Sequence, residues 1–85
     1  MDYVGGAQNH EREMTHLFIL RTNIDSRSAF RSVKRELQKL PGVHLCTIDL
    51  DDRDKVLRVA CENISIERIV EEVRKQDFFC EELED

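Results

Sequence analysis

The spacing of hydrophobic residues changes several times along the chain, and each change marks a predicted element. The run HLFILR at 16–21 is short and apolar, and polar residues follow it, so it favours a β-strand. Across Ser26–Leu40, apolar residues recur at the spacing of one helix face. Asp25 or Ser26 can cap this helix by accepting a hydrogen bond from a backbone N–H of its first turn. The Pro-Gly pair at 41–42 ends the helix.

The next two segments are predicted to form a β-hairpin. Apolar and polar residues alternate from Val43 to Leu50, which is the period of a half-buried strand. The segment Lys55–Cys61 is the next strand, and the acidic cluster at 51, 52 and 54 forms the turn between the two.

A second helix follows, with Ser65 as its N-cap. Its inward face has the spacing i, i+3, i+4, i+7 and consists of Ile66, Ile69, Val70 and Val73. Phe78, Cys80 and Leu83 then form a short last strand. The order β-α-β-β-α-β predicts an α+β, ferredoxin-like sandwich, with two helices on one face of a four-stranded antiparallel sheet. This domain spans residues 15–85, and residues 1–14 form a flexible N-terminal tail.

Composition narrows the class of protein. The three cysteines, at 46, 61 and 80, are odd in number and widely spaced, which argues against a disulfide framework and for a cytoplasmic protein with reduced thiols. A net charge of −5 disfavours nucleic acid as a partner. No run of about 18 apolar residues is present, so no membrane span is expected.

Charge and hydrophobicity each indicate a possible docking surface. A basic stripe on the first helix consists of Arg27, Arg31 and Lys34, at positions i, i+4 and i+7. It is either an ordinary solvated helix face or a docking surface for an acidic partner. The acidic turn at 49–54 and the acidic C-terminus are expected at the opposite pole. The first strand is apolar on both parities, so its second face packs in a central strand, lies under the tail, or binds a partner or a second copy as a homodimer.

Four stretches of the sequence carry a resemblance to a known family. They are FILRTNI at 18–24, ELQKLPGV at 36–43, DKVLRV at 54–59 and ENISIERIVEEVRKQDFF at 62–79. In order and spacing the chain resembles the heavy-metal-associated domain of copper chaperones and metal-transporting ATPases, and most closely a diverged bacterial branch. Members of that family bind metal through Cys-x-x-Cys at the start of the first helix.

The resemblance implies a metal loop without its ligands. The two cysteine positions fall on Ser26 and Ala29, and a hydroxyl and a methyl cannot replace the thiolates that hold a soft ion such as Cu(I). By the same resemblance, Ile24 matches the hydrophobic residue under the loop and Phe78 a residue across from it. Asp77 stands where the family usually has glycine.

These observations predict a small cytosolic binding or interaction module without a cofactor, and not an enzyme, because no catalytic motif is present. A protein partner is expected to dock on the loop and the basic helix face, through Ile24, Asp25, Ser26, Arg27, Arg31, Lys34 and Phe78. One alternative is a metal-ion binder or metallochaperone with unconventional ligands, drawn from the three cysteines or a histidine. Another is a ligand-sensing regulatory domain of the same strand order.

Overall fold

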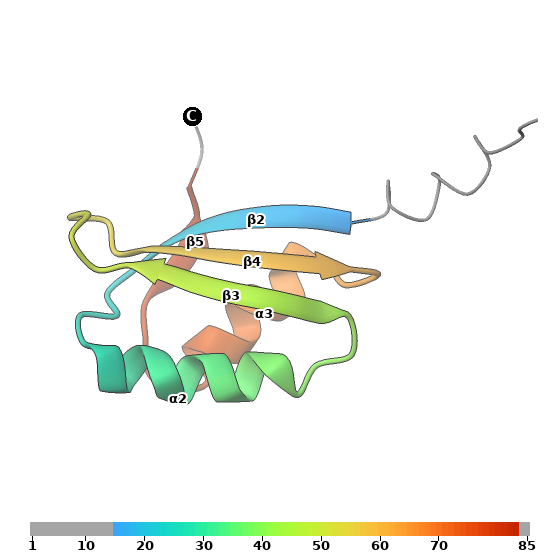
Figure 1. Cartoon of the computed structure of the whole chain (residues 1–85), viewed down its shortest axis with the longest axis horizontal. Helices are drawn as coiled ribbons and strands as arrows, with labels where there is room; N and C mark the ends of the chain where they lie inside the picture. The colour runs from blue at the N-terminus through green and yellow to red at the C-terminus, as the bar shows by residue number, and fades with distance from the viewer. Residues whose placement is uncertain (1–14, 84–85) are drawn as a thin grey trace, which may run out of the picture.

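The computed structural model describes residues 15–83 (Figure 1). The predicted tail at 1–14 and the last two residues lie outside the described residues. The elements are β2 (Thr15–Thr22), α2 (Arg27–Gln38), β3 (Val43–Asp49), β4 (Val56–Glu62), α3 (Ile66–Arg74) and β5 (Cys80–Glu82). The predicted β-α-β-β-α-β order is confirmed.

The sheet has four antiparallel strands in the order β3-β4-β2-β5. Strand β2 pairs with β4 from Thr15 to Leu20, whereas only Leu20–Thr22 pair with the much shorter β5. Both helices lie against the same face of the sheet, with α2 beneath β3 (Figure 1). The ferredoxin-like sandwich is therefore the observed architecture.

The two predicted N-caps form as expected. Ser26 Oγ accepts a hydrogen bond from the Ala29 N–H at 3.1 Å, and Ser65 Oγ accepts one from the Arg68 N–H at 3.2 Å. Both bonds satisfy backbone donors that have no partner within the first helical turn. Of the two predicted caps for α2, the structure uses Ser26 and not Asp25.

The hydrophobic core lies between the helices and the sheet. Its largest fully buried members are Leu20, Ile24, Val33, Leu37, Leu57, Val59, Ile69 and Val73, together with the three cysteines. Most of them come from alternate strand positions and from single helix faces, so burial follows the two periodicities read from the sequence. Within residues 15–83, no helix is long and apolar enough to cross a membrane.

The C-terminal part of the domain departs from the prediction in three ways. Strand β5 begins at Cys80, so Phe78 precedes it and Leu83 follows it. On α3, Ile66 and Val70 are only half-buried. Glu72 is 9% exposed on the same helix. Its carboxylate is paired with Arg68 at 3.0 Å, and this ion pair makes the burial of a charge tolerable.

The helix exit at Gly42 leaves no room for a side chain. Gly42 has a φ of +99°, and a Cβ atom placed on it would lie 2.2 Å from the backbone oxygen of Glu62. The same backbone makes a hydrogen bond, since the Glu62 N–H donates to the Gly42 carbonyl at 2.9 Å. Glycine is therefore required here by both conformation and contact.

We expect Gly42→Ala to lower the free energy of unfolding by on the order of 2–4 kcal/mol, because strain at a positive φ adds to a backbone clash. Urea denaturation followed by circular dichroism measures the change. Ser32→Ala, at an exposed position of α2, is the matched control and should change stability by less than about 0.5 kcal/mol. Equal stability of the two variants would show that the exit does not need glycine.

Candidate functional site

The loop between β2 and α2 is tied to two other parts of the chain. Thr22 is 6% exposed, and its hydroxyl donates to the Lys55 carbonyl at 2.7 Å and accepts from the Ile24 N–H at 3.1 Å. The side-chain oxygen of Asn23 accepts from the Phe79 N–H at 2.9 Å. Hydrogen bonds thus fix the loop to the β3–β4 turn and to the segment before β5.

The two expected ligand positions stand at the entrance of α2. The hydroxyl of Ser26 caps the helix and lies 3.4 Å from the hydroxyl of Ser28. Ala29 is half-buried and packs against the core. A thiolate at a helix start is stabilised by the positive end of the helix dipole, but neither of these side chains has a thiol to ionise.

Two of the predicted docking residues belong to the core. Ile24 is fully buried, and Phe78 packs against the hydrophobic core, so neither offers a partner much contact surface. The neighbouring ring of Phe79 is 46% exposed instead, and its backbone bonds to the loop. Sequence analysis missed Phe79, although alternation along the last strand, with Cys80 inward, would have turned it outward.

The basic stripe is exposed over most of its length. Arg27 and Arg31 are exposed, and Lys34 is half-buried with its ammonium 5.9 Å from the centre of the Phe30 ring. None of the ion pairs among residues 15–83 involves these three cations, whereas Lys39 pairs with Glu36. Their charge is therefore available to a partner.

The acidic turn does not lie at an opposite pole. The Thr22 N–H donates to the Asp54 carbonyl at 2.9 Å, so the β3–β4 turn adjoins the loop between β2 and α2. Arg21 connects this turn to β5, at 3.6 Å from Asp54 and 3.4 Å from Glu81. The prediction of separate poles is wrong, because the hairpin turn and the start of α2 meet at the same end of the sandwich.

The three cysteines are buried on three strands. Desolvation raises the pKa of Cys46 to about 11, an effect that the ammonium of Lys34 partly offsets, and burial also raises the pKa of Cys61. Burial raises the pKa of Cys80 to about 11 as well. These thiols are protonated at neutral pH, whereas a metal ligand is a thiolate. Within residues 15–83, no group of three or more histidine, cysteine or acidic side chains could hold a metal ion.

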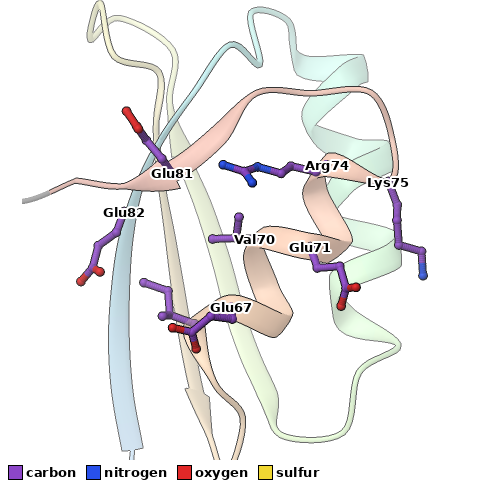
Figure 2. A pocket seen from close by; sticks show the side chains of 8 residues that line it. Glu67, Val70, Glu71, Arg74, Lys75, Glu81 and Glu82 are labelled. Carbon is purple, nitrogen blue, oxygen red and sulfur yellow. The ribbon is translucent and has the colours of Figure 1, made fainter.

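A groove of about 530 Å³ lies elsewhere, between α3 and β5 (Figure 2). Ile66 and Val70 supply its apolar surface, and charged residues of both signs surround them. Arg74 extends towards β5, where its Nε donates to the Cys80 carbonyl at 3.1 Å (Figure 2). None of the predicted docking residues lines this groove.

No family model matches this sequence, and no curated protein does so significantly. Several solved structures are similar to it, including the following two. One, from work on crosstalk between Cu(I) and Zn(II) homeostasis, has 18% identity over 80% of this chain and 99% of its own, with a TM-score of 0.70. The other, the CsoZ metallochaperone, has 18% identity over 84% of this chain and 100% of its own, with a TM-score of 0.70. The protein thus has the fold of metallochaperones.

The buried thiols should react slowly in the folded protein. A rise of the Cys46 pKa from 9.0 to about 11 lowers the thiolate fraction at pH 8 about 100-fold, and burial adds a steric barrier. The pKa of Cys46 is higher in the folded protein than in the unfolded chain. The contribution of the buried, protonated thiol to the free energy of unfolding is therefore complete below pH 9 and is lost as the pH rises towards 11. Labelling with a disulfide reagent at pH 8 measures the rate, and protein in urea is the control. Rapid labelling of the folded protein would contradict the burial.

Proposed function

We propose that this protein is a small cytosolic protein-docking module of bacterial type, built on a heavy-metal-associated scaffold that has lost its metal site. The observation that carries the proposal is the pair of residues at the start of α2. Ser26 serves as a helix cap and Ala29 packs against the core, so each has a structural role and neither supplies a thiolate. The fold shared with metallochaperones supports the choice of scaffold.

Contacts with the rest of the protein hold the loop in place. Hydrogen bonds from Thr22 and Asn23 hold it, and buried Ile24 anchors it in the core. A fixed loop suits recognition of a protein, because little conformational entropy is lost when it binds. Asn23, Asp25, Ser26 and Arg27 are exposed, and the backbone N–H of Phe79, whose ring is also exposed, donates to the Asn23 side chain.

The basic stripe supplies the electrostatic part of docking. Three cations on one helix face of a protein with net charge −5 create a local positive field. Such a field mainly accelerates and orients encounter with an acidic partner. A module of this kind needs no catalytic group, and we propose that the protein is not an enzyme.

The open face of the sheet supports a second, weaker proposal of a homodimer. Leu17 and Leu45 are 59% and 55% exposed, and both lie opposite Ala60 in the strand register. They form an apolar row across three strands, which would be covered if two copies packed face to face. Sedimentation at increasing concentration tests this, with Leu17→Lys expected to keep the protein monomeric. A wild-type protein that stays monomeric at about 1 mM would refute it.

The main proposal is tested by titrating the reduced protein with Cu(I), Zn(II) and Cd(II) and recording native mass spectra. We expect no stoichiometric binding by the wild type. The double variant Ser26→Cys, Ala29→Cys should bind one Cu(I), because the helix dipole favours thiolates at these positions. Ser26→Cys alone is the control and should bind much more weakly. Wild-type binding at micromolar affinity or tighter would overturn the proposal.

A further inference from the structure

Strand β3 forms one edge of the sheet and is open to an added strand. It pairs with β4 on one side, and no other strand within residues 15–83 pairs with it on the other. It has seven residues, whereas the opposite edge strand, β5, has three. A row of unpaired backbone donors and acceptors on such an edge can pair with another extended chain.

The register shows which backbone groups face outward. The Glu62 N–H donates across to Gly42, so the backbone groups of Glu62 point towards β3. Because this direction alternates along a strand, Ala60 and Arg58 also point towards β3, opposite Leu45 and Thr47. The N–H and C=O groups of Cys46 and Ile48 therefore point away from the sheet.

The basic stripe runs along this same edge. Helix α2 packs against β3. Burial raises the pKa of Cys46, which lies in the middle of this strand, and the positive charge of Lys34 partly offsets that rise. Helix α2 runs antiparallel to β3 (Figure 1). Arg31 precedes Lys34 by about one helical turn, so its position on the helix is closer to the C-terminal end of β3. The helix side of the edge is thus positive. The other side carries the exposed side chain of Leu45.

Pairing of two β3 edges in a symmetric dimer is disfavoured by the same charges. A two-fold axis would place two copies of the stripe next to each other, and like charges brought together cost free energy. Cations at an edge protect against self-association, and here they also select the partner. The acidic turn at 49–54 limits the positive region to the part of the edge beside Arg31 and Lys34.

We propose that β3 accepts an extended segment of a partner protein in which acidic and apolar residues alternate. The segment adds as a strand to β3, its backbone pairs with Cys46 and Ile48, its carboxylates face Arg31 and Lys34, and its apolar side chains cover Leu45. Alternation is required because successive side chains of a strand point to opposite faces. The inference rests on the proposed docking function and specifies its partner.

The test is the binding of a blocked peptide of about eight residues, the length of one strand, in which Glu and Val alternate. We expect saturable binding to the wild-type protein, with amide shifts of Cys46 and Ile48 in NMR spectra. The same peptide with N-methyl groups at alternate residues cannot pair on one edge and should bind at least about tenfold more weakly. A Lys-Val peptide should not bind.

Charge-reversal variants of the protein provide the matched comparison. Arg31→Glu with Lys34→Glu should weaken peptide binding about tenfold or more. Lys39→Glu with Lys75→Glu makes the same change in net charge at two exposed positions, the C-caps of α2 and α3, and should change peptide binding less than about twofold. Circular dichroism of both variants checks that each is folded.

Two results would overturn the strand addition. Equal binding of the N-methylated peptide, still sensitive to the Arg31 and Lys34 reversal, would leave docking on the basic face but exclude pairing with β3. No binding of the Glu-Val peptide at about 1 mM would exclude the proposed partner chemistry. Failure of the docking function itself is seen separately, as tight metal binding by the wild-type protein.

Discussion

The arrangement of the loop between β2 and α2 depends on two hydrogen bonds of the Thr22 hydroxyl. This hydroxyl is buried, and it links the last residue of β2 to the β3–β4 turn through Lys55 and to the loop through Ile24. A buried hydroxyl that lost these partners would cost free energy, so the three segments are held in one geometry. The start of α2, with its cap at Ser26, is placed by this junction.

Ser26 and Ala29, at the start of α2, are integrated into the fold. Ser26 satisfies a backbone donor of α2, and Ala29 fills space beside the core. The remaining thiols are inward-facing on three strands, where desolvation keeps them protonated. A small hydrophobic role is the usual one for such cysteines. The side chains at the start of α2 therefore serve in capping and packing.

What is left on the surface is a set of groups without partners inside the described domain. The cations of α2 and the outward backbone groups of β3 lie along one edge of the sandwich, whereas the exposed ring of Phe79 precedes β5 at the opposite edge. Each by itself is common on protein surfaces. The cations and the backbone groups together give the β3 edge electrostatic and hydrogen-bonding character, which is the combination that strand addition uses.

The sequence by itself determined the order of the elements, the Ser65 cap and the absence of thiols at the loop, because periodicity, capping and residue chemistry are local properties. It left the cap of α2 open between Asp25 and Ser26, and the structure has Ser26. The end of the first helix was also predictable from the sequence, because the Pro-Gly pair at 41–42 stops a helix. Only the tertiary structure decided that Phe78 is packed inward and Phe79 exposed, that the acidic turn adjoins the loop, and that the stripe on α2 borders the edge strand β3. These facts depend on which distant segments become neighbours. Strand order and register set those neighbours, and no spacing within one segment encodes them.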